Sequence, residues 1–315
     1  MDQAPGNPAS HVPVAPDVRI ARADFGRVSV LFGEKNGKYP DGNQVLIRGS
    51  DTRAAFDTPR VSNHIGAEFD ATELVVMGHV HEDHMAALHR IARAAVHVHE
   101  ADLPAIRSWD GMLAAYGLRE QDAAEMHDLL QRDFFYAPRP DAQGYVDGTC
   151  WDLGQSRIRA FHLPGHTVGH CVLLVEPEGV AFTGDIDLTG FGPYYGDACS
   201  SLRDFRRSLA RLPDIPAKVW VTSHHRGVYT DRDHFLRDLA AYAAKLDERE
   251  RRLLAWLKDA PQTLEQLVEQ RLLYPPGYES PWVRSAETRT ISQHLAELMA
   301  DGRVERDGDG AYRLA

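Results

Sequence analysis

Residues 74–84 read LVVMGHVHEDH, an apolar run followed at once by three histidines and an aspartate. The apolar run has the composition of a buried β-strand. The polar residues after it fall on a loop, where side chains can converge because a loop does not impose helical or sheet direction. Imidazole and carboxylate are the nitrogen and oxygen donors that zinc takes in hydrolytic sites. The stretch therefore predicts a metal site at the end of a strand, with candidate ligands His79, His81, Asp83 and His84.

Three later segments repeat this arrangement of a strand that ends in metal donors. HLPGHTVGH ends a strand predicted over 157–163, FTGDIDLTG ends one over 180–183, and VTSHHRG ends one over 219–222. The donors that these segments offer are His162, His166, His170, Asp185, Asp187, His224 and His225.

The ordered set of motifs resembles the metallo-beta-lactamase superfamily, whose HxHxDH loop is followed by a PGHT-like turn, a TGD-like turn and a late histidine. The resemblance covers about residues 28–229. It implies a dinuclear hydrolase in which one metal is held by His79, His81 and His166. It implies a second metal held by Asp83, His84 and a late histidine, with Asp185 bridging the two. The late position is doubled in this chain, and we prefer His224 to His225 there.

The same resemblance implies the cofactors and the catalytic residue. Two divalent ions would share a hydroxide that attacks the substrate, and Asp83 would orient that hydroxide. Zinc is the first choice, with iron or manganese as alternatives because nitrogen and oxygen donors do not select sharply among divalent ions. Asp57 resembles the family's structural carboxylate. His162 and His170 are expected to orient the ligand turn or to pack in the core, and Asp187 to brace its loop.

The pattern of elements predicts an α/β fold, which the resemblance makes a four-layer αββα sandwich over residues 18–245. Strands alternate with helices that are predicted over 85–93, 104–131 and 202–212. A proline-rich segment at 1–17 is expected to be a flexible arm.

Residues 246–315 are expected to form a small domain of three helices and a hairpin, which resembles a winged helix. Thr263 and Gln266 predict a capping box at the start of one helix, and 307–310 predict the hairpin turn. We count 10 basic and 13 acidic residues from Asp247 to Ala315, a net charge of −3. This charge disfavours a nucleic-acid surface, so we expect the segment to pack on the catalytic domain, to shape its cleft or to mediate a homodimer.

Composition limits the remaining classes of protein. The formal charge is −11, from 35 basic and 46 acidic residues, and no run approaches the roughly 18 apolar residues of a membrane span. We expect a cytoplasmic protein without a signal peptide. The three cysteines form no CxxC pair and are expected to be buried free thiols.

The segment GFGPYYGD after the bridging aspartate suggests the class of substrate. Its aromatic residues suit a flat or apolar organic molecule, so we predict cleavage of an ester, thioester or lactone bond, as in the glyoxalase II, lactonase and thioesterase members of the superfamily. The candidate substrate contacts are Phe191, Tyr194, Tyr195 and His225. Three alternatives are an endoribonuclease that uses the winged helix, a mononuclear iron sulfur dioxygenase, and a DNA-binding regulator.

Overall fold

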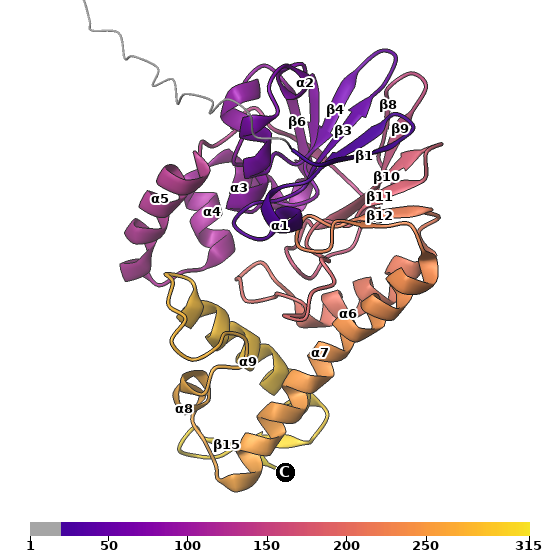
Figure 1. Cartoon of the computed structure of the whole chain (residues 1–315). Coiled ribbons are helices and arrows are strands. Elements are labelled where there is room, and N and C mark those ends of the chain that lie inside the picture. The colour runs from indigo at the N-terminus through magenta and orange to yellow at the C-terminus, as the bar shows by residue number, and fades with distance from the viewer. Residues whose placement is uncertain (1–19) are drawn as a thin grey trace, which may run out of the picture.

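The computed structural model describes residues 20–315, in which two β-sheets lie face to face (Figure 1). The first sheet has seven strands in the order of the sequence, antiparallel from β1 to β4 and parallel from β4 to β7. Its strands are β1 (Arg22–Phe25), β2 (Val28–Leu31), β3 (Gln44–Arg48), β4 (Arg53–Phe56), β5 (Leu74–Val76), β6 (Ala95–His99) and β7 (Gln143–Tyr145). The expected arm at 1–17 lies outside the described residues.

The second sheet has six strands in the order β13-β12-β11-β10-β9-β8, of which only β11 and β12 pair in parallel. Its strands are β8 (Cys150–Asp152), β9 (Arg157–His162), β10 (Cys171–Glu176), β11 (Val180–Phe182), β12 (Val219–Val221) and β13 (Val228–Tyr229).

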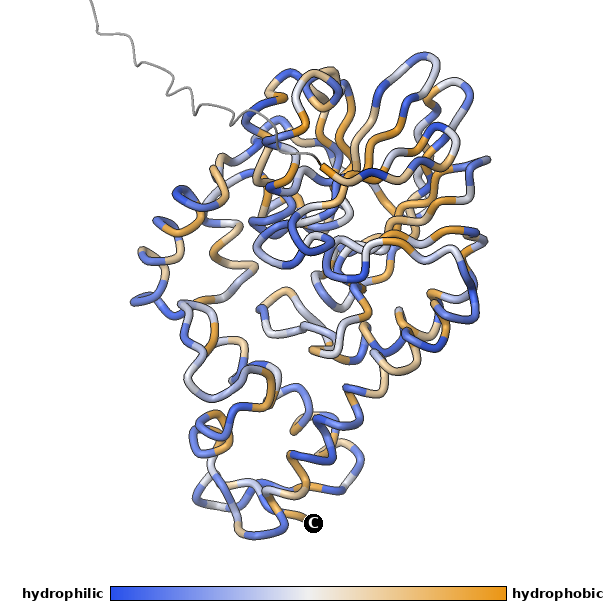
Figure 2. Tube along the Cα trace, viewed as in Figure 1, coloured by the Kyte–Doolittle hydropathy of each residue, from blue (hydrophilic) through white to orange (hydrophobic). Residues whose placement is uncertain are grey.

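Alternation along the central strands explains why both faces of each sheet are covered. In β5, Leu74 and Val76 enter the core between the sheets, whereas Val75 packs under the outer helices of the first sheet. In β10, Leu173 points into the same central core and Leu174 into the core on the opposite side. A strand that is buried on both faces reads as a continuous apolar run, as these strands do in Figure 2.

Helices form the two outer layers. The first sheet is covered by α3 (Leu103–Arg107), α4 (Trp109–Tyr116) and α5 (Glu120–Phe134), and the second by α6 (Leu202–Arg211) and the start of α7 (Arg232–Asp259). The short helices are α1 (Glu34–Gly37) and α2 (Ala67–Asp70), with 3-10 turns at Arg60–His64, Glu82–His84, Leu88–Ile91, Glu100–Asp102 and Leu212–Asp214. This arrangement confirms the four-layer α/β sandwich.

The C-terminal segment follows the end of α7 and lies at the end of the molecule away from the sheets (Figure 1). It contains α8 (Leu264–Glu269), α9 (Val283–Ala300) and a hairpin of β14 (Val304–Arg306) and β15 (Tyr312–Leu314). The capping box of Thr263 and Gln266 is confirmed. The expected boundary between 245 and 246 lies inside α7, which packs Leu246 in the sandwich and Leu253 in the C-terminal core.

The sequence prediction was wrong in several elements. No α-helix spans 85–93, where only the 3-10 turn Leu88–Ile91 forms, because the backbone of His84 and Ala87 pairs with Thr58 instead. The short strands β1, β7, β8 and β13 were not predicted. Cys150 is exposed on β8 rather than buried, whereas Cys171 lies in the central core as expected.

Among residues 20–315, no helix combines the length and the apolar character that crossing a bilayer requires.

Glu287 on α9 determines the path of the chain that leads from α8 to α9. Its carboxylate is fully buried and accepts hydrogen bonds from the backbone N–H groups of Leu272 at 2.7 Å, Leu273 at 3.0 Å and Tyr274 at 2.8 Å. We predict that Glu287→Ala lowers the free energy of unfolding by about 3 kcal/mol, because charge-assisted bonds are lost and donors stay buried. Urea denaturation measures this loss.

The matched control is Glu279→Ala, which removes an exposed carboxylate from the same segment. It should change the free energy of unfolding by about 0.5 kcal/mol or less. Equal losses in the two variants would contradict the role of Glu287.

Candidate metal centre

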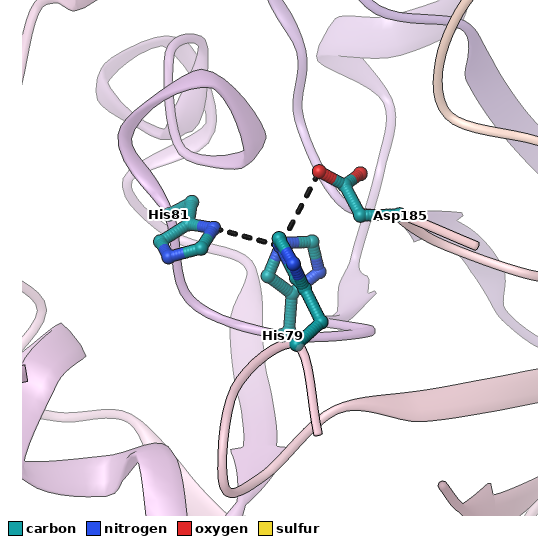
Figure 3. A group of neighbouring side chains, drawn as sticks. His79, His81 and Asp185 are labelled. Atoms are coloured by element: carbon teal, nitrogen blue, oxygen red, sulfur yellow. Dashed lines mark hydrogen bonds and ion pairs between the residues drawn. The ribbon is translucent and has the colours of Figure 1, made fainter. Parts of the chain in front are cut away.

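The segments that follow β5, β9, β11 and β12 meet at one edge of the sandwich. Each strand delivers a loop to this edge, so donors that are more than a hundred residues apart in sequence become neighbours. Figure 3 shows His79, His81 and Asp185 converging on a common space. Three groups of donor atoms result, and in each group the atoms lie within 4.8 Å of one another: His79, His81, His166 and Asp185; Asp83, His84 and His224; and Asp57, His79 and His84. The first two groups contain all of the candidate ligands.

The first group is organised around His166. Its Nε2 lies 3.0 Å from Nδ1 of His81 and 3.3 Å from Oδ2 of Asp185. His79 completes the group, with its ring centroid 4.7 Å from that of His166. The geometry therefore offers three imidazoles and one carboxylate oxygen to a single ion.

The second group is organised around Asp83. Its Oδ2 lies 3.0 Å from Nε2 of His224 and 3.6 Å from Nε2 of His84. Oδ1 of Asp185 lies 3.0 Å from the same His84 nitrogen and 3.4 Å from that of His224. Asp185 thus presents one oxygen to each group, as a bridging ligand would.

Unpartnered buried atoms test whether these residues fit a metal. A buried polar atom without a hydrogen bond is costly, and native structures hold few of them. Among the described residues, six buried atoms without a hydrogen-bond partner lie in the two groups of candidate ligands. Some pairs of these atoms are about 3 Å apart, but their angles do not allow a hydrogen bond. The six atoms are both ring nitrogens of His79, Oδ2 of Asp83, Nε2 of His84, Oδ1 of Asp185 and Nε2 of His224. Cations at this position would satisfy these atoms, with one of the two ring nitrogens of His79 as the ligand, so the donor set fits divalent metal ions.

A second set of hydrogen bonds fixes the orientation of the rings. Each of four histidines has one nitrogen toward the centre and the other nitrogen held from outside, which selects the tautomer that a metal needs. The outer partners are Oδ2 of Asp197 for His81 (2.9 Å), Oδ2 of Asp57 for His84 (2.7 Å), the carbonyl of Tyr194 for His166 (3.0 Å) and the carbonyl of Gly37 for His224 (2.9 Å). Sequence reasoning missed Asp197 and the two carbonyls, because only folding brings them near the rings.

Asp57 holds two loops together, as expected of the structural carboxylate. It adopts a left-handed backbone conformation, with φ of 51°, which aspartate tolerates better than most residues. Its Oδ1 accepts a hydrogen bond of 2.6 Å from the backbone N–H of Gly78, while Oδ2 pairs with His84.

Charge in the centre favours ionised carboxylates. Burial raises the pKa of Asp185, but His224 and His84 outweigh burial and hold this pKa well below its ordinary value. Burial and the neighbouring imidazoles hold the pKa of His79 well below its ordinary value, so that ring is neutral. An ionised aspartate and a neutral imidazole are the forms that ligate a divalent ion.

The doubled histidine separates into two positions. His224 is buried and turns Nε2 into the second group, whereas His225 has a left-handed φ of 57° and lines the neighbouring pocket. His170 lies outside the two groups. Its Nδ1 is 3.1 Å from the carbonyl oxygen of Leu163, and it has no hydrogen bond to a side chain of the described residues. His162 stacks on His99, with ring centroids 4.0 Å apart.

A pocket of about 340 Å³ opens beside the centre. Of the expected substrate contacts, Phe191, Tyr194 and His225 line it. Tyr195 does not, and its assignment is corrected: it is fully buried with its hydroxyl 2.8 Å from Nε2 of His294. Asp187 lines the pocket and braces its loop by accepting hydrogen bonds from Thr189.

Sequence reasoning missed several residues of the pocket wall: Tyr39, Glu82, Tyr116, Asp197, Tyr274, Tyr278 and Trp282. The signal for the last three was present in YPPGYESPW at 274–282, which places three aromatic residues in a loop rich in proline and glycine. A loop of this composition has little core to pack, so its rings face a cleft or solvent.

We predict that Asp197→Ala lowers the affinity of the centre for zinc by about 10- to 100-fold, because His81 loses the partner that orients its ring. A competition titration against a chromophoric chelator measures this affinity. Asp128→Ala, which removes an exposed carboxylate on α5, is the control and should leave the affinity unchanged. An unchanged affinity in Asp197→Ala would mean that packing alone orients His81.

The comparisons with known proteins agree with this geometry. The metallo-beta-lactamase superfamily pattern matches residues 74–225. A beta-lactamase-like protein 2 homolog from Drosophila melanogaster is 22% identical over 306 residues, which are 93% of this chain and 95% of that protein. The human acyl-coenzyme A thioesterase MBLAC2 is 27% identical over 210 residues, 59% of this chain and 73% of that protein.

Two further similarities are to a curated hydrolase and to a solved structure. A hydroxyacylglutathione hydrolase from Methylococcus capsulatus is 30% identical over 143 residues, 44% of this chain and 54% of that protein. The crystal structure of a metallo-beta-lactamase family protein from Thermus thermophilus has a TM-score of 0.63 at 26% identity, covering 87% of this chain and 94% of that one. Residues 74–225 therefore form a metallo-beta-lactamase superfamily domain, and the chain is a hydrolase.

Proposed function

We propose that the chain is a dinuclear metal-dependent hydrolase that cleaves an ester or thioester bond of a small organic molecule. The position of Asp185 carries this proposal, because its two oxygens face two separate groups of buried, unpartnered donors. The names of the thioesterase and hydroxyacylglutathione hydrolase relatives support the type of bond.

The assignment of ligands follows from the two groups. One ion would be held by His79, His81 and His166, the other by Asp83, His84 and His224, and Asp185 would contact both. Zinc suits these donors best, and iron or manganese would also fit. When bound, such ions supply Lewis acidity and lower the pKa of water to near neutrality.

Asp83 is the residue that would position the attacking water. Burial raises the pKa of Asp83, but His84 and His224 outweigh burial and lower this pKa. The ionised carboxylate could then accept a hydrogen bond from the attacking water. Glu82, the next residue along the pocket wall, is held by hydrogen bonds from the hydroxyls of Tyr39, at 2.9 Å, and Tyr116. These bonds fix the wall beside Asp83.

Charge argues against the endoribonuclease alternative. No lysine or arginine lines the pocket in the part of the chain that the structure describes, while five carboxylates do. RNA binding depends on basic groups that neutralise phosphates. The second group of donors likewise favours a dinuclear centre over a mononuclear iron site.

The number of metal ions bound per chain tests the dinuclear assignment. Zinc titrated into the metal-free protein should saturate at about two equivalents per chain. Asp83→Ala should retain tight binding of one ion, because the first group is intact. A fully active enzyme with a single ion per chain would overturn the dinuclear assignment.

A second prediction tests the reaction. Zinc-loaded protein should cleave acyl thioesters of N-acetylcysteamine and aryl esters, and Asp83→Ala should lower kcat by about 100-fold or more. Asp128→Ala is the matched control and should keep the wild-type rate. If single-stranded RNA is cleaved instead, and this cleavage is lost in Asp83→Ala, the ester hydrolase proposal is wrong.

A further inference from the structure

Five aromatic side chains form a continuous surface in the pocket, which we call the aromatic wall: Tyr39, Phe191, Tyr274, Tyr278 and Trp282. Three of them belong to the loop between α8 and α9. The C-terminal segment therefore supplies most of this surface, although the candidate metal ligands all belong to the sandwich.

The aromatic wall begins at the candidate metal centre. The ring of Tyr39 lies 6.4 Å from that of His224 and 6.5 Å from that of Trp282. The indole Nε1 of Trp282 donates a hydrogen bond of 3.1 Å to the hydroxyl of Tyr274. A group bound on this surface would therefore reach the reacting bond without crossing solvent.

The outer part of the wall is made of stacked rings. Tyr274 and Tyr278 lie 5.2 Å apart with their planes 8° from parallel, and Phe191 lies 5.7 Å from Tyr274. Tyr278 remains 41% exposed, so one ring face at the end of the stack is open. Such faces attract flat ring systems in offset or edge-to-face contact.

Buried polar groups hold the wall in place before a ligand binds. Glu287 fixes the backbone of Tyr274, as described above. Arg249 on α7 donates hydrogen bonds to the carbonyls of Phe191, at 2.7 Å, and Pro193, and its guanidinium lies over the ring of Phe191. A surface that is already ordered binds more tightly, because little conformational entropy is lost on binding.

The charge of the pocket limits what the wall can hold. Its charged lining residues apart from histidine are all acidic: Glu82, Asp83, Asp185, Asp187 and Asp197. Two divalent ions would neutralise Asp83 and Asp185, and His81 pairs with Asp197. Glu82 lies beside Tyr39, at the inner end of the wall. The outer part of the wall, away from the candidate ions, has no lysine or arginine among the lining residues that the structure describes. An anionic group bound on that part would be desolvated without a cationic partner in the lining, which is unfavourable.

We propose that the aromatic wall binds an uncharged, flat aromatic acyl group of the substrate, and that any anionic part of the leaving group lies outside the pocket. This inference rests on the proposed hydrolase function. In the reaction, the oxygen of water bonds to the acyl carbon and the carbon–sulfur or carbon–oxygen bond breaks. The thiol or alcohol leaves with one proton, and the aromatic carboxylate is released with the other proton passing to solvent.

Four thioesters with the same neutral thiol, N-acetylcysteamine, test the selectivity of zinc-loaded, full-length protein. They carry benzoyl, heptanoyl, 4-carboxybenzoyl and acetyl groups. Benzoyl and heptanoyl match in carbon number and differ in flatness, while benzoyl and 4-carboxybenzoyl differ in charge. We expect kcat/KM for benzoyl to exceed each of the others by about 10-fold or more. A preference for heptanoyl or for 4-carboxybenzoyl over benzoyl would overturn the proposal.

Tyr278→Ala tests the wall itself, since an exposed ring can be removed with little risk to folding. It should raise KM for the benzoyl thioester by roughly 3- to 10-fold, the contribution expected of one aromatic pair. Phe135→Ala, which removes an exposed ring outside the pocket, is the control and should leave both this KM and the turnover of the acetyl thioester unchanged. Equal KM values for Tyr278→Ala and wild type would refute the assignment.

A binding measurement separates this inference from the proposed function. Benzamide is uncharged, flat and resistant to hydrolysis, and its binding to zinc-loaded protein can be followed by saturation-transfer NMR. Binding that weakens in Tyr278→Ala, but not in Phe135→Ala, would support the wall even if no thioester were cleaved. Thioester cleavage without benzamide binding or acyl preference would support the hydrolase and refute the wall.

Discussion

The carboxylate of Asp185 lies between two groups of histidines, and the rest of the centre is arranged around this one ionised side chain. A charged carboxylate below a protein surface is unstable unless opposite charge surrounds it. Here the histidines that surround the carboxylate come from the ends of strands in both sheets. The two sheets must therefore pack with these ends in register, and the central core between them holds that register.

The histidines around Asp185 are themselves fixed from behind. Asp57 and Asp197 hold two of the rings, and backbone carbonyls hold two others. The outer partners come from three segments: Asp57 follows β4, Gly37 ends α1, and Tyr194 and Asp197 share the loop between β11 and α6. A shift of any of these segments would turn a ring away from the centre. The layered sandwich thus contributes rigidity as well as position, which a site that binds two ions close together requires.

Several features could not be predicted because they depend on contacts between distant segments. The stretch 85–93 has helical periodicity, yet it does not form an α-helix. The backbone of Thr58 instead forms hydrogen bonds with the carbonyl of His84 and the N–H of Ala87, which a helix would need. Tyr195 and Tyr194 are adjacent aromatic residues, and only their packing sends one into the core and the other into the pocket. The strands that escaped prediction are two to four residues long, too short for an alternating pattern to be recognised.

Local pattern was sufficient for the fold class and for placing metal-donor residues at the ends of four strands, because each set of donors follows an apolar strand directly. The choice of seven candidate ligands among these donors came from the resemblance to the superfamily. The sequence also shows two adjacent histidines, His224 and His225, at the late position. Which of them faces the metal centre depends on the left-handed backbone of His225 and on the hydrogen bond between His224 and the carbonyl of Gly37. Apart from Asp57, the outer partners and the aromatic wall are recognised only in the folded chain. Some of their contacts join residues more than a hundred positions apart, such as His81 with Asp197 and Tyr39 with Trp282, and a local sequence pattern cannot predict such contacts.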